Sequence, residues 1–323
     1  MPTKLQSFLS PVSTEEKEEK LIWHYTSMQV LLDMLEGKTG LYATHIRFLN
    51  DKVEFKYGLE QLRKIYTKIA REKRKQYIDE KTLVNHGSST DAEHDRCLIN
   101  DSCKQSACDD LFVTCFSNRK DDLSMWRSYT PVGGVCIGFR QESLINNIFK
   151  GVAPEVISGL DDEINYLGLD DDLITAFGKC QYNPDWLANT TDKTDLFGIK
   201  TLLDRINHYG EADELAIEHD MDELRRKLTV LCAFTKHPSF AAEDEIRIAL
   251  TGNELYPKIE IVGGKPRVPI TGVEKDNIGK FITNVVISPH GDSERNLTLV
   301  KLYAKKLGVL INVEPSLCPY NGR

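Results

Sequence analysis

Three segments that lie far apart in the chain carry side chains with complementary chemistry. They span residues 23–27, 115–129 and 243–247. A histidine can hold ribose hydroxyl groups, an aromatic ring can pack against a departing ring, and a carboxylate can stabilise a developing positive charge. Cleavage of the bond between nicotinamide and ribose needs these groups, because it passes through an oxocarbenium-like state. The three segments together are therefore consistent with a glycosyl-transfer site.

In such a site, His24 would hold the ribose and Glu245 would stabilise the transition state, with Glu243 as the alternative carboxylate. The aromatic face would come from one of three rings, which are Tyr25, Trp126 and Tyr129. The other interpretation is structural: Glu245 and Arg247 form an ion pair within a sheet, and His24 is an ordinary half-buried histidine. Spacing alone favours this structural interpretation.

A strand followed by a helix is expected to position His24. The aromatic run around it is β-prone. Thr26 or Ser27 can then cap a helix whose apolar positions recur at helical spacing, namely Val30, Leu31, Met34 and Leu35. Gly37 ends this helix, and a new strand begins at residues 41–44. Because free backbone N–H groups at a helix N-terminus favour phosphate, His24 lies where strand–helix folds usually hold ligands.

The later segments read as a mixture of strands and helices. Strands are predicted at residues 111–117, 135–139, 245–250, 281–288 and 309–313. Helices are predicted at residues 124–129 and about 295–307, the second closed by Gly308. Residues 141–230 are predicted to be mainly helical and contain an acidic stretch. The expected fold class is therefore α+β, with a mixed or antiparallel sheet core and a helical insertion.

Length and composition limit the function classes. The chain has 323 residues, 41% of them hydrophobic, and a net charge of −8, which argues against a general nucleic-acid binder. A local basic patch is nevertheless predicted on a helix between Arg63 and Lys75. Residues 1–20 predict a flexible leader rather than a secretion signal, and no apolar stretch is long enough to cross a membrane. We therefore expect a cytoplasmic protein with reduced thiols and a single α+β domain at residues 21–320.

Two polar segments offer metal ligands but favour other interpretations. Asn50, Asp51 and Glu54 match a helix-capping pattern, and the alternative is that one of them points into a pocket. Residues 85–110 contain histidines and cysteines without the CxxC pairs that structural zinc sites usually show. We therefore expect no metal site.

The motifs occur in an order that resembles one bacterial family, catalogued only as domain of unknown function 2971. The motifs are WHYTS at 23–27, LND at 49–51 with Glu54, TCFS at 114–117, Met125-Trp126, GVCIGF at 134–139, Lys236 with Glu243, Glu245 and Arg247, and Pro319-Tyr320. This resemblance covers roughly residues 22–320. The family name implies no activity.

A more distant similarity is to ADP-ribosyltransferases. The aromatic–His–x–Thr run, followed by a helix, a glycine and a new strand, is similar to toxins that modify nucleic acid and to tRNA phosphotransferases that use NAD. The resemblance implies an ADP-ribosyltransferase-like sheet core and NAD as substrate. His24 matches the first catalytic position, Ser117 or Tyr129 the middle one and Glu245 the last. The implied NAD contacts come from His24, Tyr25, Thr26, Arg47, Ser117, Trp126 and Arg127, and either arginine would meet the pyrophosphate.

The expected function is an NAD-dependent ADP-ribosyltransferase that modifies a nucleic acid or a protein. The setting implied by the resemblance is a toxin or an anti-phage defence effector, with a partner protein in the same system. One alternative is an NAD glycohydrolase without an acceptor, which product analysis would distinguish. Another is a non-catalytic binding or sensor module, which NAD would not stabilise. The last is a metal-dependent nuclease using Asp51, Glu54 and Glu245.

Overall fold

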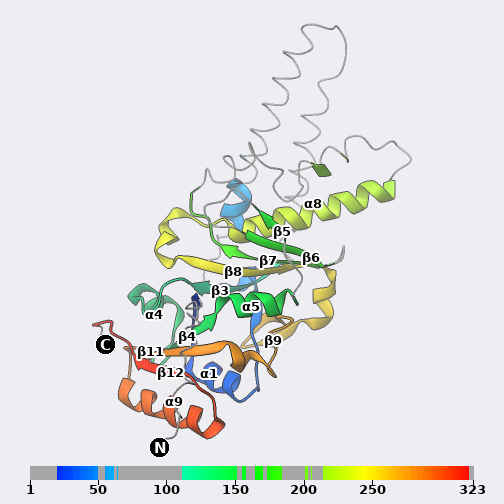
Figure 1. The fold of residues 1–323 in the computed structure, drawn as a ribbon. Helices are drawn as coiled ribbons and strands as arrows, with labels where there is room; N and C mark the ends of the chain where they lie inside the picture. The colour runs from blue at the N-terminus through cyan, green and yellow to red at the C-terminus, as the bar shows by residue number, and fades with distance from the viewer. Residues whose placement is uncertain are drawn as a thin grey trace, which may run out of the picture.

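The computed structural model shows a large mixed sheet flanked by helices (Figure 1). This confirms the α+β class. The structure describes residues 20–49, 55–61, 64, 111–150, 155–157, 164–169, 173–183, 201–202, 205 and 214–319. Within these ranges, twelve strands belong to one sheet.

The strands and helices follow one another along the whole described chain. The strands are β1 (Leu21–Thr26), β2 (Tyr42–His45), β3 (Leu111–Ser117), β4 (Val135–Arg140), β5 (Glu155–Ile157), β6 (Ile164–Leu169), β7 (Leu173–Lys179), β8 (Glu245–Thr251), β9 (Glu260–Val262), β10 (Lys265–Pro269), β11 (Ile282–Ile287) and β12 (Asn312–Pro315). The α-helices are α1 (Met28–Leu35), α4 (Leu123–Tyr129), α5 (Gln141–Ile148), α8 (Glu214–Phe234) and α9 (Ser293–Leu307). Short 3-10 helices are η1 (Ile46–Phe48), η3 (Pro238–Glu243), η4 (Asn253–Lys258) and η5 (Ile278–Phe281).

The sheet runs in the order β12-β11-β4-β1-β3-β8-β7-β6-β5. Only β11 and β12 pair in parallel, and the other described pairs are antiparallel. Helix α8 contacts β7 and β8, whereas α9 contacts α1 and β12 at the opposite end of the sheet (Figure 1). The helices therefore cover different parts of a sheet that is too long for one helical layer.

The sheet forks along β3. One end of β3 pairs with β1, through Trp23 and Ser117. Its other end pairs with β2, where Thr44 lies opposite Val113. A branch of β2, β10 and β9 therefore leaves the main sheet on the side of β3 that β1 also occupies. The backbone of β3 between the two branches has to find hydrogen-bond partners other than a continuous neighbouring strand.

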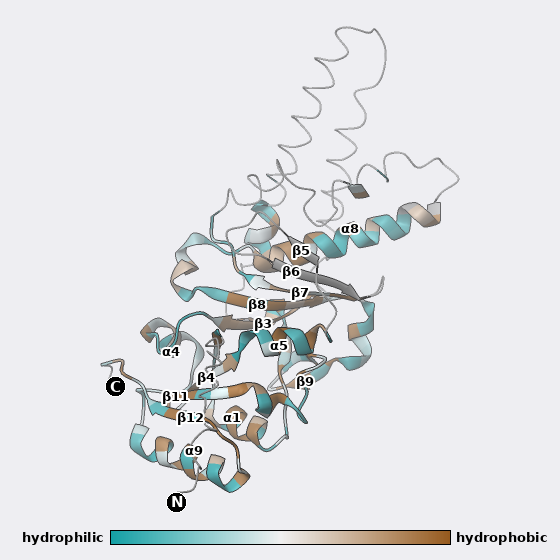
Figure 2. Ribbon diagram, viewed as in Figure 1, coloured by the Kyte–Doolittle hydropathy of each residue, from teal (hydrophilic) through white to brown (hydrophobic). Residues whose placement is uncertain are grey.

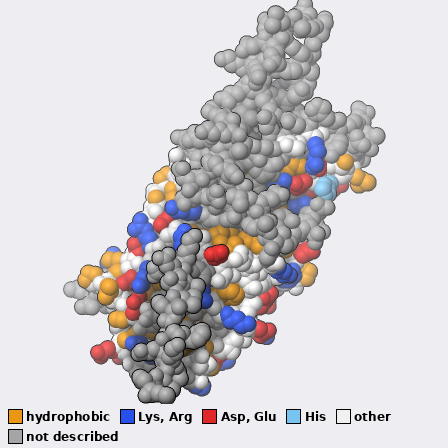
Figure 3. Space-filling view, in the orientation of Figure 1, with side chains coloured by type: hydrophobic (Ala, Val, Ile, Leu, Met, Phe, Trp, Pro, Cys, Tyr) orange, Lys and Arg blue, Asp and Glu red, His pale blue; other side chains and the backbone are white. Residues whose placement is uncertain are grey.

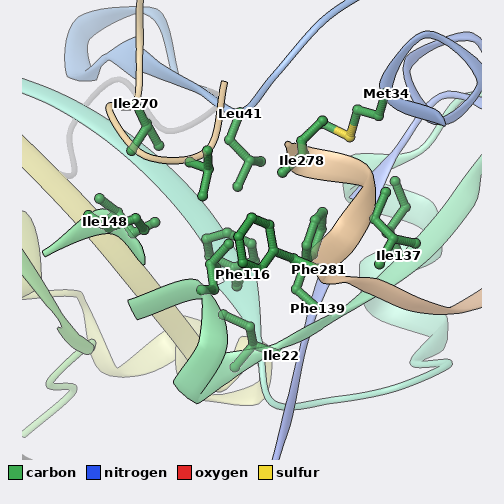
Figure 4. Packing of buried hydrophobic residues seen from close by; sticks show 14 of the residues in the cluster. Ile22, Met34, Leu41, Phe116, Ile137, Phe139, Ile148, Ile270, Ile278 and Phe281 are labelled. Carbon is green, nitrogen blue, oxygen red and sulfur yellow. The ribbon is translucent and has the colours of Figure 1, made fainter. Parts of the chain in front are cut away.

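The main hydrophobic core lies between the sheet and its flanking helices. Phe116 and Phe139 pack edge to face with their ring centroids 5.8 Å apart. Phe281 lies beside them in the same cluster (Figure 4). Helix α9 carries both hydrophobic and hydrophilic residues, and Val300 and Ala304 are the ones it buries (Figure 2). Burial of one face thus fixes each helix against the sheet, as expected for amphipathic elements.

Most element predictions are confirmed. The strands predicted at 111–117, 135–139, 245–250 and 281–288 correspond to β3, β4, β8 and β11. Ser27 caps α1 by accepting from the Val30 backbone N–H, as one of the two proposed caps. Asp292 begins α9 and Gly308 ends it in the left-handed conformation. These segments have a long apolar pattern or clear capping residues, so the local sequence is sufficient to predict whether each is a strand or a helix.

The prediction of a mainly helical segment at 141–230 is wrong for its middle part. Strands β5, β6 and β7 lie there and extend the sheet beyond β8. Residues 170–172 are acidic and suggest solvent exposure, whereas the short apolar run that follows them forms β7. Helices α5 and α8 do occupy the two ends of the segment. The leader at 1–19, the basic residues of the Arg63–Lys75 segment other than Lys64, and residues 50–54 and 85–110 lie outside the described residues.

Candidate functional site

A pocket of about 930 Å³ lies at the fork of the sheet. Its walls come from β1, α1, β2, β3, α4, η3, β8 and β10. This volume falls in the upper part of the range for small-molecule sites. The polar side chains that line it include His24, Tyr129, Lys236, Glu243, Glu245, Arg247, Lys265 and Arg267. All three segments singled out from the sequence therefore contribute residues to one pocket.

His24 bridges the fork. Its Nδ1 lies 2.9 Å from the Cys115 carbonyl oxygen, so a protonated Nδ1 donates to a backbone group between the two branches of the sheet. Burial lowers the pKa of His24 below its usual value; the hydrogen bond to Cys115 opposes this effect and the charge of Arg267 adds to it. The imidazole is therefore neutral near pH 7, and its Nε2 offers a lone pair. No described residue is hydrogen-bonded to Nε2.

A network of four charged residues forms another part of the pocket lining. Lys236 lies 2.5 Å from a carboxylate oxygen of both Glu243 and Glu245. Arg247 binds both oxygens of Glu245, at 2.9 and 3.1 Å, and also donates to the Ala233 carbonyl oxygen. Lys236, Glu245 and Arg247 are buried. A buried charge is unfavourable unless it is paired, and each of these three side chains has a partner of opposite sign in the network.

The two glutamates differ in how fully they are engaged. Burial opposes ionisation of Glu245, but the charges of Arg247 and Lys236 outweigh it and hold its pKa well below the usual value. Its side chain is 5% exposed, whereas that of Glu243 is 13% exposed. Glu243 receives one hydrogen bond from Lys236 and one from Tyr129. Glu243 therefore presents the more accessible carboxylate, and Glu245 mainly holds the two cations.

Backbone geometry brings both glutamates to Lys236. Asp244, between them, adopts the left-handed conformation with φ 43° and ψ 53°, which is uncommon for a residue other than glycine. The Ser117 hydroxyl donates to the Glu243 carbonyl oxygen at 2.6 Å, and the Glu245 backbone N–H donates to the Tyr182 hydroxyl at 2.9 Å. The strained residue thus lies between two fixed neighbours, a pattern that occurs often at functional sites.

Helix α4 brings Tyr129 into the pocket. Its hydroxyl donates to Glu243 at 2.7 Å. Burial raises the pKa of Tyr129. The charge of Lys236 opposes this rise and the Glu243 carboxylate increases it, so the hydroxyl stays protonated. Asp122 caps the helix by accepting from the Ser124 and Met125 backbone N–H groups. The ring of Tyr129 therefore borders the pocket with its hydroxyl fixed.

The start of α4 is fastened to a segment from much later in the chain. Asp121 accepts from the Trp126 indole N–H at 2.7 Å and from the Leu317 backbone N–H at 2.6 Å. The Ser316 hydroxyl contacts the same carboxylate, and the Cys318 thiol donates to the Asp121 carbonyl oxygen. Residues 316–318 thereby form a clasp on α4, and through α4 they fix Tyr129.

The predicted site residues fall into two groups. His24, Tyr25, Thr26, Tyr129 and Glu245 line the pocket. The Tyr25 hydroxyl, however, is occupied by the Arg119 carbonyl oxygen and the Asp122 backbone N–H. The residues that do not line the pocket are Arg47, Ser117, Trp126 and Arg127.

These four residues have other positions. Ser117 and Trp126 are fully buried and make the structural hydrogen bonds described above. Arg47 and Arg127 are exposed on η1 and α4. Contacts of these four side chains with a ligand in this pocket are therefore not expected.

Three cations of the pocket received no role from the sequence. The sequence motifs include Lys236 without a role, and they do not include Lys265 or Arg267. A signal for the last two was present: Gly263-Gly264 precedes Lys265 and Arg267, which are two residues apart. Two glycines before an alternating run predict a hairpin, and residues two apart share one face of a strand. The pair of cations was therefore readable as one basic face.

One group of potential metal ligands lies outside the pocket. His219, Asp220 and Glu223 on α8 have ligand atoms within 4.8 Å of one another. Asp220 already accepts two hydrogen bonds from Arg205, at 2.7 and 2.9 Å. Glu223 is paired with Lys227. The cluster is therefore accounted for as an ion-pair network.

The described surface carries charges of both signs. On the face shown in Figure 3, Lys and Arg side chains are interspersed with Asp and Glu side chains. None of the described helices is both long enough and apolar enough to cross a membrane.

Comparison with known proteins gives one match. The family model described as a protein of unknown function (DUF2971) matches residues 125–248. This stretch begins within α4 and ends within β8, and it includes Tyr129, Lys236, Glu243, Glu245 and Arg247. No curated protein and no solved structure matches the chain. The chain is thus similar to a family without a described activity across one wall of the pocket.

Proposed function

We propose that the pocket binds NAD and that the protein transfers ADP-ribose to a nucleic acid or a protein. The observation that carries this proposal is the convergence of His24, Tyr129 and the Glu243–Lys236–Glu245 network on one pocket. Breakage of the nicotinamide–ribose bond needs a ribose-binding group, an aromatic face and a carboxylate. The pocket has one of each in a volume large enough for a nucleotide.

In this proposal the residues that line the pocket have separate roles. The neutral His24 accepts a hydrogen bond from a ribose hydroxyl through Nε2, because Nδ1 is used by Cys115. The ring of Tyr129 packs against nicotinamide. Glu243 stabilises the positive charge that develops on the ribose and then accepts the proton of the acceptor nucleophile. Nicotinamide leaves as the neutral base, and the bond from ribose C1 to the acceptor replaces the bond that broke.

Glu245 has a positioning role in this scheme. Its two oxygens are taken up by Lys236 and Arg247. Loss of its charge would leave these two buried cations with less compensation and would shift Lys236 away from its present position between the glutamates. The proposal therefore moves the reacting carboxylate from Glu245, the first choice from sequence, to its neighbour Glu243.

The test is incubation of the purified protein with NAD labelled in its adenosine part, with and without cell lysate. We expect label on a macromolecule, with Glu243→Gln lowering the rate by about 100-fold or more while NAD still binds. Glu245→Gln should lower both stability and rate. Glu254→Gln is the control, because Glu254 is an exposed glutamate that does not line the pocket and pairs with Lys258.

The products decide between the proposal and its rivals. Label on RNA, DNA or protein supports a transferase and identifies the acceptor class. Free ADP-ribose in every fraction indicates an NAD glycohydrolase in the same pocket. Unchanged NAD together with no thermal stabilisation by NAD refutes the proposal and leaves a non-catalytic binding module.

A further inference from the structure

Two cations that line the pocket have no partner of opposite charge among the residues that the structure describes. Lys265 and Arg267 lie two residues apart on β10, so both side chains are on the face that lines the pocket. Neither side chain makes a hydrogen bond or an ion pair with another described residue. Arg267 Nε is buried without a partner. Lys236 and Arg247, which also line the pocket, differ from them because both are paired with glutamates.

The nearby carboxylates are engaged elsewhere. Glu260 lies directly opposite Arg267 in the β9–β10 pair, where side chains can interact. It instead accepts from the Tyr42 hydroxyl at 3.1 Å. Asp33, a third carboxylate of the pocket besides the two glutamates, accepts from Gln29. A buried guanidinium N–H without an acceptor is unfavourable, so an acceptor from outside the chain would satisfy it.

Arg267 lies close enough to His24 for their charges to interact. Burial without a carboxylate lowers the pKa of Arg267, and the charge of Arg267 in turn contributes to lowering the pKa of His24. Strand β10 is held by its pairing with β2, where Arg267 lies opposite Thr44, and by the buried Val268. The cations therefore stand at a fixed place next to the candidate ribose-binding group.

We propose that Lys265 and Arg267 form an anion subsite that binds the phosphate groups of a nucleotide in the pocket. A diphosphate carries two or more negative charges and offers several acceptor oxygens, which suits one guanidinium and one ammonium on the same strand face. That this nucleotide is NAD rests on the proposed function, whereas the phosphate subsite itself does not. Lys265 and Arg267 thus take the phosphate-binding role that the sequence analysis gave to Arg47 or Arg127, which do not line the pocket.

The experiment is titration calorimetry of the full chain with ADP, pyrophosphate and adenosine. We expect Arg267→Gln and Lys265→Gln each to weaken ADP binding by about tenfold or more and to leave adenosine binding within about twofold. Lys258→Gln is the control, because Lys258 lies on neighbouring η4, does not line the pocket and pairs with Glu254. It should bind ADP as the wild type does.

Each result decides for or against the subsite. Equal ADP affinity in wild type and both variants overturns it, as does an equal loss of ADP and adenosine binding. The subsite is also overturned if the wild type binds neither ADP nor pyrophosphate. If Arg267→Gln does not fold, Arg267→Lys, which keeps the charge, should retain most ADP affinity while Lys265→Gln loses it. Weakened ADP binding in a protein that leaves NAD intact supports the subsite and refutes only the proposed function.

Discussion

Lys236→Met should be among the most destabilising single changes at the pocket. Lys236 is 3% exposed and is the only described cation that contacts both Glu243 and Glu245. Methionine has a similar length and no charge, so the change removes the ion pairs without leaving a large cavity. Removal of one partner from a buried ion pair lowers the free energy of unfolding by about 3–5 kcal/mol. Glu245 keeps Arg247, so we expect a value near the lower limit, about 3 kcal/mol.

Calorimetry can measure this change. With an unfolding entropy of about 2.1 cal/mol/K per residue, a loss of 3 kcal/mol in a chain of 323 residues lowers Tm by about 4 °C. Lys258→Met is the matched control, because Lys258 is 43% exposed and its pair with Glu254 is 3.9 Å long. Exposed pairs contribute about 0–1 kcal/mol, so the control should shift Tm by about 1.5 °C or less.

The pH dependence gives a second measurement of the same network. In the folded wild type the pKa of Glu245 is about 2, against an ordinary value of 4.5, so its contribution to stability is complete above pH 4.5 and is lost as the pH falls towards 2. In Lys236→Met the folded pKa of Glu245 lies closer to the ordinary value. The stability difference between wild type and variant should therefore shrink below pH 4.5. Equal Tm values for Lys236→Met and wild type at pH 7 would refute this account of the network.

Three further predictions concern the supports of the site. Trp126→Phe removes the hydrogen bond to Asp121 and should lower the free energy of unfolding by about 1–3 kcal/mol by chemical denaturation; an unchanged value would show that this contact does not hold α4. Gly138→Ala should destabilise by about 1–3 kcal/mol, because its Cβ would lie 2.8 Å from the Trp23 ring; wild-type stability would mean that the ring can move aside. Neutral His24 predicts that NAD binding falls only in acid, below the usual imidazole range; a midpoint at or above pH 6.5, by fluorescence titration, would contradict its lowered pKa.

The sequence predicted elements well where the local pattern is strong. The strand, cap and helix around His24 follow from an aromatic run, a serine and apolar residues at helical spacing, and all three are present. Strand β7 was missed because its pairing with β8 decides its structure, whereas the acidic residues before it suggested solvent exposure. Local signals dominate the first case, and a partner remote in sequence dominates the second.

The sequence indicated several residues of the candidate site, but it did not indicate which of them contact one another. Alternation along β8 placed Glu245 and Arg247 on one face, and they do form the ion pair of the structural interpretation. The third partner, Lys236, comes from the segment after α8, and nothing in its local sequence indicates that contact. The fork of the sheet could not be predicted from the sequence either, because it depends on the pairing of both β1 and β2 with β3.

The clasp of residues 316–318 on Asp121 has a consequence for protein synthesis. Ser316 is 195 residues downstream of Asp121, so a ribosome completes this contact long after it has made α4. The other walls of the pocket also join residues as distant as His24 and Arg267, and such non-local contacts form late in folding. A nascent chain interrupted before residue 316 would therefore have Tyr129 on an unfastened helix. Premature termination at that stage would release a fragment that contains α4 but lacks the clasp, so the part of the pocket that Tyr129 lines would be fastened only in chains translated past residue 318.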